Sequence, residues 1–274
     1  MTIELTETFT SSQGEVRWAR LGDGPPVVLV HGWPFSSWIW GDVAAGLATR
    51  HTVYVWDLPA FGRSARRPGQ DVTLAGHAGV FAELLAHWGL DAGEGPTVVA
   101  HDIGGAVALR THLLHGMPYA RLALIDAVAV APWGSEFFHL VRGAADTFAR
   151  IPPELHAALV RGYVGGTGGA PLSPEAVEAL AGPWLDEEGR AAFYRQIAAL
   201  RQEHTDEIEP RYGELDLPVL ICWGTEDAWL PVERGRKLAG LIPGARLRLL
   251  QGAGHLVPVQ APAALTGELL TWRA

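Results

Sequence analysis

The sequence has a single cysteine, Cys222, among its 274 residues. One cysteine excludes an intrachain disulfide and a metal cluster built on cysteine ligands. Positive charge is also scarce, because 21 Lys and Arg stand against 30 Asp and Glu, for a formal net charge of -9. That balance argues against the broad basic surface that a nucleic-acid partner requires.

Long apolar segments are missing as well. No stretch is long and apolar enough to span a bilayer, so we expect no membrane partner. Residues 1–14 are rich in Thr, Ser and Glu and lack the apolar segment of a signal peptide. The simplest expectation is a cytoplasmic protein.

Short apolar runs recur along the chain and alternate with helical patterns. With 48% hydrophobic residues, the chain can bury the core of one domain, or of a domain with an insertion. The expected strands are Val27–Val30, Thr52–Trp56, Thr97–Ala100, Leu122–Ile125, Val219–Trp223 and Arg246–Leu250. The expected helices include Leu74–Trp88, Gly104–Leu114 and Val232–Leu241. Apolar strands that alternate with helices predict an α/β fold with a parallel sheet covered on both faces.

The alternation breaks between residues 131 and 214. This segment contains several prolines, a glycine-rich run at residues 165–169, and helical patterns at Glu175–Leu180 and Arg190–Gln202, but no convincing strand. We therefore expect a core formed by residues 1–130 and 215–274. Residues 131–214 would form a helical cap, with the glycine run as a loop within it.

The strongest chemical signal is the run Val-Val-Ala-His-Asp-Ile-Gly-Gly at residues 98–105. A strand, a sharp turn and a helix meet at Asp102, which is the geometry of a nucleophile elbow. Serine is usual at this position, flanked by glycines, but here an aspartate stands between Ala100 and Gly104. The N–H groups and dipole of the helix start favour the ionised, nucleophilic carboxylate. The alternative is that Asp102 only caps the helix.

A second signal, His31-Gly32-Trp33-Pro34, follows the strand at residues 27–30. In an elbow enzyme the turn after this strand supplies one backbone N–H of the oxyanion hole, and the residue after the nucleophile supplies the other. The predicted donors are therefore the N–H groups of Trp33 and Ile103. The alternative is a buried His31 in an ordinary turn.

A histidine and two candidate acids complete the set. His255 follows the last expected strand, between Gly254 and Leu256, and lies downstream of the elbow as the nucleophile, acid, histidine order requires. Asp227 follows the strand at residues 219–223, and Asp126 follows the strand at residues 122–125. Either carboxylate could orient the imidazole and stabilise its cation. We favour Asp227 and keep Asp126 as the alternative acid.

These elements together resemble the epoxide hydrolase and haloalkane dehalogenase branch of the α/β-hydrolases. The resemblance rests on residues 31–34, 57–64 and 101–105, on Asp227 and on residues 254–255. It covers residues 16–126 and 216–272 and is weaker in the insertion, which occupies the place of the family's cap. It implies an α/β-hydrolase fold and a hydrolase that opens an epoxide to a diol.

The resemblance also implies donors in the cap. The run Ala192-Phe193-Tyr194-Arg195 resembles the motif that carries an epoxide-activating tyrosine, whose phenol would stabilise the developing alkoxide. His139 is the expected second donor, with Tyr163 behind it. The alternative for Tyr194 is an aromatic residue packed in a cap helix.

Dehalogenation is the second function that the resemblance allows. Dehalogenases of the branch often place tryptophan after the nucleophile as a halide donor, and fluoroacetate-type enzymes place arginine there. Ile103 fits neither pattern, although Trp33, Trp133 or Trp184 could supply an indole N–H.

The implied mechanism has two steps. Asp102 attacks an electrophilic carbon to form an alkyl ester, and a water activated by His255 then hydrolyses it. No metal and no cofactor is expected, because the histidines lack the spacing of a zinc site. The expected substrate is a small apolar epoxide or halide in a pocket near His31, Trp33, Phe138, Trp133, Trp184 and Tyr163. The sequence leaves a homodimer open, and the non-enzymatic alternative is a binding protein of the same fold.

Overall fold

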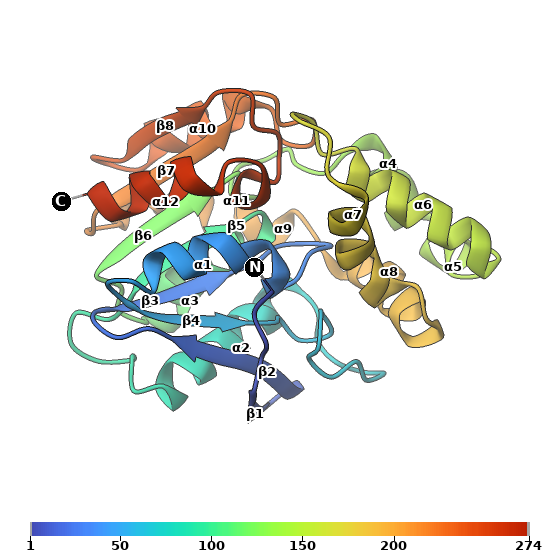
Figure 1. Ribbon diagram of the computed structural model, residues 1–274, viewed down its shortest axis with the longest axis horizontal. Coiled ribbons are helices and arrows are strands. Elements are labelled where there is room, and N and C mark those ends of the chain that lie inside the picture. The colour runs from blue at the N-terminus through green and yellow to red at the C-terminus, as the bar shows by residue number, and fades with distance from the viewer. Residues whose placement is uncertain (1, 273–274) are drawn as a thin grey trace.

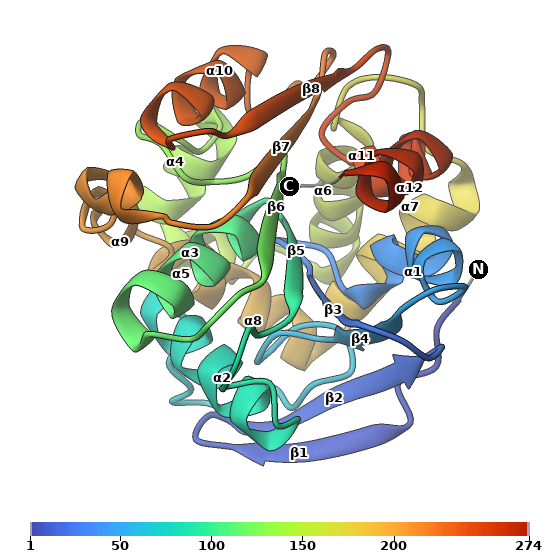
Figure 2. The same ribbon diagram turned by 90° about the vertical axis from the view of Figure 1, so that its left-hand side faces the viewer.

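The computed structural model describes residues 2–272, and its centre is an eight-stranded sheet with helices on both faces (Figures 1 and 2). The strands are β1 (Glu7–Ser11), β2 (Gly14–Leu21), β3 (Pro26–Val30), β4 (Thr52–Trp56), β5 (Thr97–His101), β6 (Arg121–Ile125), β7 (Val219–Gly224) and β8 (Arg246–Leu250). Their order across the sheet is β1-β2-β4-β3-β5-β6-β7-β8. β2 pairs antiparallel with both β1 and β4, and the other neighbours are parallel.

The six predicted strands match the structure to within one residue at each end, but the hairpin of β1 and β2 was not predicted. In β1 the first four residues are exposed or half-buried, and only Ser11 is buried. An edge strand of this kind lacks the continuous apolar run that identifies the central strands.

The core helices form two layers. α1 (Gly41–Leu47), α11 (Val257–Gln260) and α12 (Pro262–Thr271) lie on one face of the sheet, whereas α2 (Leu74–His87), α3 (Ile103–His115) and α10 (Val232–Leu241) lie on the other (Figure 2). Local signals set their ends: the Thr73 side chain accepts the Gly76 N–H at the start of α2, and Gly116 ends α3 in the left-handed conformation. A short 3₁₀ helix, η1 (Ser37–Trp40), leads into α1.

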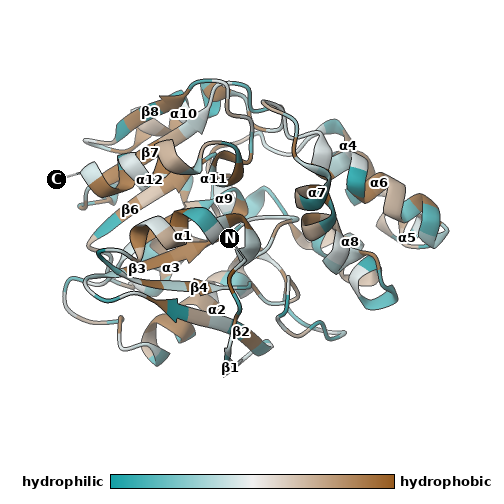
Figure 3. Cartoon of the chain, in the orientation of Figure 1, coloured by the Kyte–Doolittle hydropathy of each residue, from teal (hydrophilic) through white to brown (hydrophobic). Residues whose placement is uncertain are grey.

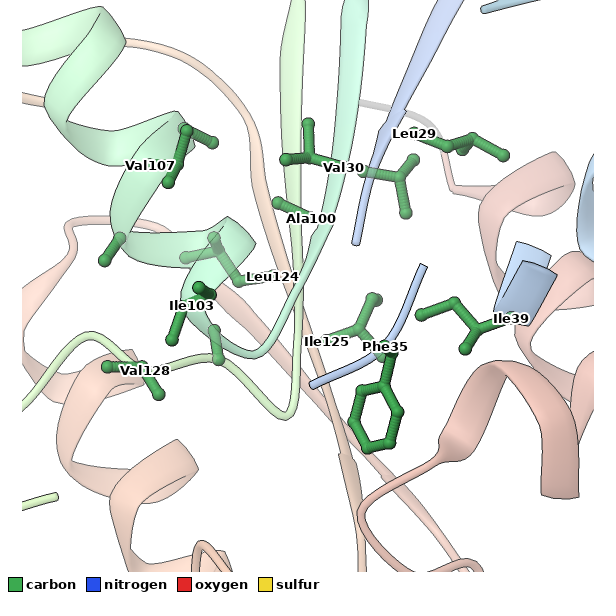
Figure 4. Close-up of a cluster of buried hydrophobic side chains, with 14 of the residues drawn as sticks. Leu29, Val30, Phe35, Ile39, Ala100, Ile103, Val107, Leu124, Ile125 and Val128 are labelled. Carbon is green, nitrogen blue, oxygen red and sulfur yellow. The ribbon is translucent and has the colours of Figure 1, made fainter. Parts of the chain in front are cut away.

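The buried core runs along both faces of the central strands. Beyond their first residue, β3, β5 and β6 are buried throughout, as expected for parallel strands covered by helices. Figure 4 shows one part of this core, where Val30, Ala100 and Leu124 from these three strands lie near Val107 of α3. In Figure 3 the inner strands are mainly brown, which marks hydrophobic residues, whereas the helices of the insertion carry many hydrophilic residues, drawn in teal. Within residues 2–272, no helix is long and apolar enough to cross a membrane.

The insertion is helical and lies to one side of the sheet (Figure 1). It contains α4 (Glu136–Gly143), α5 (Ala145–Phe148), α6 (Pro153–Gly165), α7 (Pro174–Ala181), η2 (Gly182–Trp184), α8 (Glu187–Ala199), α9 (Glu203–Asp206) and η3 (Glu209–Glu214). Several side-chain bonds fasten it to the core. For example, Trp184 Nε1 donates to the Pro34 carbonyl at 2.6 Å, and Gln196 Nε2 donates to the Ala60 carbonyl at 3.0 Å.

Candidate active site

Asp102 lies in the sharp turn between β5 and α3. Its φ of 52° and ψ of -126° are unusual for a residue with a side chain. The turn is tight, because a Cβ on Gly32 would collide with the Asp102 side chain, and one on Gly105 would lie 2.5 Å from Ala127 Cβ. The Asp102 side chain makes no capping hydrogen bond to α3, so the interpretation of Asp102 as a simple helix cap is wrong.

The two oxygens of the Asp102 carboxylate have different surroundings. Oδ1 accepts the Trp33 N–H at 2.8 Å, so the predicted oxyanion donor already binds this oxygen. Oδ2 lies 3.3 Å from His255 Nε2. Only 6% of Asp102 is exposed. One oxygen is thus held by the backbone, while the other faces the histidine.

His255 connects Asp102 to a second carboxylate. Its Nδ1 lies 2.9 Å from Asp227 Oδ2, and Asp227 Oδ1 accepts the N–H groups of Trp229 and Leu230, each at 2.8 Å. Burial lowers the pKa of His255, but the charges of Asp227 and Asp102 outweigh it and hold the pKa well above its ordinary value. Asp227 is therefore fixed as the direct partner of the imidazole.

Asp126, the alternative acid, has different partners. It is fully buried, and its Oδ1 accepts the Gly224 N–H at 2.8 Å. Its Oδ2 has no hydrogen-bond partner among the described residues. Burial, reinforced by the charge of Asp227, raises the pKa of Asp126 well above its ordinary value. A carboxyl that holds its proton is poorly suited to stabilise an imidazolium.

A small cavity of about 30 Å³ adjoins Asp102. Its lining residues are Trp33, Asp102, Ile103, Val128, Trp133, Gly134, Ser135, Phe138, Tyr163, Leu200, Trp229 and Leu230. Asp102 is the one charged side chain in this lining. Its mainly apolar and aromatic lining suits an uncharged molecule.

Four of the six predicted pocket residues, Trp33, Trp133, Phe138 and Tyr163, line this cavity, but His31 and Trp184 do not. The ring of His31 accepts the Leu58 N–H at Nε2 and bonds the Gly32 carbonyl through Nδ1, so it braces the loop behind the pocket. Trp184 uses its indole N–H to fasten the cap. The prediction of both as substrate-binding residues is wrong.

Both predicted cap donors also lie elsewhere. The Tyr194 hydroxyl bonds His156 Nδ1 at 2.9 Å inside the cap, and His156 Nε2 in turn bonds the Trp184 carbonyl at 2.8 Å. His139 is exposed on α4. Because neither Tyr194 nor His139 lines the cavity, their assignment as epoxide-activating donors is corrected. The alternative interpretation of Tyr194 as a packed cap residue agrees with the structure.

Tyr163 of α6, the remaining candidate donor of the cap, lines the cavity. Its ring stacks on Trp229 with centroids 4.4 Å apart, and Trp229 lies 4.9 Å from the His255 ring. Its hydroxyl is 3.5 Å from Ser135 Oγ. Burial raises the pKa of Tyr163, with a further contribution from the charge of Asp102, so the phenol keeps its proton.

Sequence reasoning missed one supporting histidine and six of the twelve lining residues, namely Val128, Gly134, Ser135, Leu200, Trp229 and Leu230. Trp229 and Leu230 follow Asp227 directly, and their N–H groups hold its carboxylate, a signal that the turn after β7 could have provided. His101 precedes Asp102 and donates from Nε2 to the His255 carbonyl at 2.8 Å. Burial lowers the pKa of His101 to about 3, so it acts as a neutral brace.

Comparison with known proteins identifies the fold family. The sequence pattern of the alpha/beta hydrolase family matches residues 27–268. An alpha/beta hydrolase fold protein from Burkholderia ambifaria has a crystal structure that superimposes with a TM-score of 0.95, at 41% identity over 99% of each chain. The α/β-hydrolase fold predicted from the sequence is therefore confirmed.

The relatives that carry functional names include an esterase and a dehalogenase. A pimeloyl-[acyl-carrier protein] methyl ester esterase of Chromobacterium violaceum is 30% identical over 238 residues, which are 86% of this chain and 89% of that protein. Haloalkane dehalogenase 2 of Mycobacterium tuberculosis is 27% identical over 285 residues, which are 96% of this chain and 92% of that protein. The family is thus shared by relatives with different substrates.

Proposed function

Because this chain belongs to the α/β-hydrolase family, we propose that it is a hydrolase that opens a small epoxide to a diol through an ester on Asp102. One observation carries the proposal. The Asp102 carboxylate stands at the elbow with Oδ1 on the Trp33 N–H and Oδ2 beside His255, at the edge of an apolar cavity. This is the arrangement that a carboxylate nucleophile and its hydrolytic base require.

In the first step, Asp102 Oδ2 attacks a ring carbon of the epoxide, and the carbon–oxygen bond of the ring breaks. The Trp33 N–H keeps Oδ1 in place and so orients the attacking oxygen. The Tyr163 side chain lines the cavity, and its hydroxyl gives its proton to the leaving oxygen as negative charge develops there. Solvent water then returns a proton to the phenolate. The product is a hydroxyalkyl ester of Asp102.

In the second step, water attacks the carboxyl carbon of Asp102, and His255 Nε2 takes the proton of that water. The first step helps to prepare this base. Esterification removes the negative charge of Asp102, which is one of the causes of the raised pKa of His255. The imidazole therefore releases its proton more readily once the ester has formed, and Asp227 stabilises it when it accepts a new one. The N–H groups of Trp33 and Ile103 receive the oxyanion. When the oxyanion collapses, the ester carbon–oxygen bond breaks, and His255 gives the proton to the departing oxygen of the diol.

Halide release is the second candidate, and one observation favours it. The Trp33 indole Nε1 is buried without a hydrogen-bond partner among the described residues, beside Asp102. The indole N–H groups of Trp133 and Trp184 are occupied by Thr205 Oγ1 and the Pro34 carbonyl. An unpartnered donor of this kind could bind a departing halide, and a relative named a haloalkane dehalogenase shares the fold family.

Ester hydrolysis by the usual serine route has less support, although a relative is named an esterase. That route forms an acyl-enzyme on a hydroxyl, and Asp102 occupies the position of the hydroxyl. A carboxylate that attacked an ester carbonyl would form an anhydride instead.

Purified protein should be tested against paired panels of small epoxides and small haloalkanes, with diol and halide measured together. We expect diol formation that Asp102→Ala abolishes. Halide release without diol formation would select the second candidate. If neither panel is turned over, the chain is a binding protein or acts on other substrates, and the proposal fails.

A further inference from the structure

The glycine-rich run of the insertion crosses the catalytic loops. We call residues 166–170 the cap strap. Gly168 forms an antiparallel bridge with Asp227, and Gly169 forms one with Ala253. The strap therefore connects the loop that carries the acid with the loop that carries His255, although the sequence shows it only as a loop.

The strap holds the main chain of the catalytic histidine. The Thr167 carbonyl accepts the N–H of His255 at 2.8 Å and the N–H of Ala228 at 3.4 Å. Glycine is needed for this approach, because Gly168 has a φ of +79° and a Cβ there would collide with the Glu226 carbonyl. The cap thus contributes a backbone acceptor to the position of His255.

Gln260, the last residue of α11, fastens the strap to the histidine loop. Its Nε2 donates to the carbonyls of Gly168 and Ala170, each at 2.7 Å. Its Oε1 accepts the N–H of Gly254 at 2.8 Å, directly before His255. One side chain therefore makes three bonds that tie the two segments together.

We propose that Gln260 is a positioning residue that clamps the cap strap against the His255 loop and thereby sets the imidazole for ester hydrolysis. Gln260 is outside the cavity lining, so it does not contact substrate there. It acts through the backbone of residues 254–255 and through the Thr167 carbonyl. The effect of Gln260 on ester hydrolysis rests on the proposed function, but its effect on the position of the His255 backbone does not.

The two half-reactions separate positioning from general damage. Ester formation needs Asp102, whereas ester hydrolysis also needs His255. Loss of the clamp should therefore slow hydrolysis at least tenfold, or about 1.4 kcal/mol, while ester formation stays within about twofold, or about 0.4 kcal/mol. A distorted or partly unfolded pocket would slow both steps.

Gln70 provides a matched control remote from the site. Its Nε2 donates to the carbonyls of Gln13 and Ala65, and its Oε1 accepts the Arg67 N–H. It has the same pattern of three backbone bonds as Gln260. Gln260→Met and Gln70→Met each keep the length of the side chain and remove the three bonds. Gln260→Glu keeps the acceptor oxygen and the shape of the side chain but loses both N–H donors. It replaces Gln260→Met in the experiment if that variant fails to fold.

Two measurements decide the proposal. Amide hydrogen exchange of His255 reports the clamp without any substrate, and single-turnover kinetics report ester formation and hydrolysis separately. We expect Gln260→Met to exchange the His255 amide at least tenfold faster, or about 1.4 kcal/mol less protected, and to accumulate ester, and Gln70→Met to do neither.

Unchanged exchange and unchanged hydrolysis in a folded Gln260 variant would overturn the proposal, and so would equal losses in both half-reactions. If the unaltered protein forms no ester with any substrate, the proposed function fails instead. The exchange result would then still decide whether Gln260 fixes the His255 loop.

Discussion

Replacing His255 with glutamine should separate the two steps of the proposed mechanism. His255 Nε2 lies 3.3 Å from Asp102 Oδ2, and its other nitrogen is held by Asp227. A glutamine amide has no basic nitrogen, and general-base catalysis is worth about 10² to 10⁴ in rate. Hydrolysis of the ester should fall by about that factor, which is about 3 to 5 kcal/mol of barrier. Ester formation uses the Asp102 carboxylate and should continue.

The assay is mass spectrometry after mixing His255→Gln with an epoxide and digesting the quenched protein. We expect the peptide that contains Asp102 to gain the mass of the epoxide. His139→Gln is the matched control, because that histidine is exposed and outside the cavity lining, and it should accumulate no adduct. In the unaltered protein, a single turnover in heavy-oxygen water should label Asp102 and not the first diol, since water attacks the aspartyl carbon.

One result would refute this reasoning. If the heavy oxygen enters the first diol directly and His255→Gln accumulates no adduct, Asp102 acts as a base that activates water. The covalent route would then be wrong, although the fold and the contacts around Asp102 would be unchanged.

Three further predictions concern the residues around Asp102 and His255. Tyr163→Phe should lower epoxide turnover at least tenfold, or about 1.4 kcal/mol, whereas Tyr194→Phe should keep turnover and cost about 1 kcal/mol of folding stability. Steady-state rates and thermal melts measure the two effects, and the opposite ranking would make Tyr194 the donor again. Asp227→Asn should slow ester hydrolysis at least a hundredfold, or about 2.7 kcal/mol. Asp126→Asn should slow it little, because burial already raises the pKa of Asp126. Equal effects of the two variants in stopped-flow traces would show that both acids orient His255. The rate of ester hydrolysis should rise with pH to a plateau, since neutral imidazole is the base. The midpoint of this profile should lie below the pKa of His255 measured by NMR in the free protein, where the charge of Asp102 still raises that pKa. Equal values would contradict the argument that esterification removes this charge.

The elbow could be predicted from the sequence because its signals are local. A strand, a turn and small residues after Asp102 occupy a few consecutive positions. A Cβ on Gly104 would lie 2.5 Å from the His31 carbonyl oxygen, which shows why a small residue is required there. The order of Asp102, Asp227 and His255 along the chain then predicts which strand ends carry the partners. The choice between Asp227 and Asp126 needed coordinates, because it depends on which carboxylate reaches Nδ1.

The cap could be predicted as helical but not in its orientation. Successive residues of an α-helix point about 100° apart. On α8 this places Phe193 against Trp33 and turns the hydroxyl of Tyr194 toward His156. A motif that names the tyrosine therefore does not determine whether its hydroxyl reaches the pocket. Packing of the whole helix against the core decides it, and no single residue signals that packing in the sequence.

The same reasoning distinguishes the positions of Asp102, His255 and Asp227 from that of Tyr163. Asp102, His255 and Asp227 lie in turns at the ends of strands whose register is fixed by the sheet. Tyr163, in contrast, belongs to α6, and its place above the site depends on stacking against Trp229 and on the strap that follows its helix. A rotation of α6 would move the Tyr163 side chain and leave the elbow intact. In the proposed mechanism, packing of the cap therefore decides which donor meets the leaving oxygen, whereas the elbow positions the carboxylate that attacks.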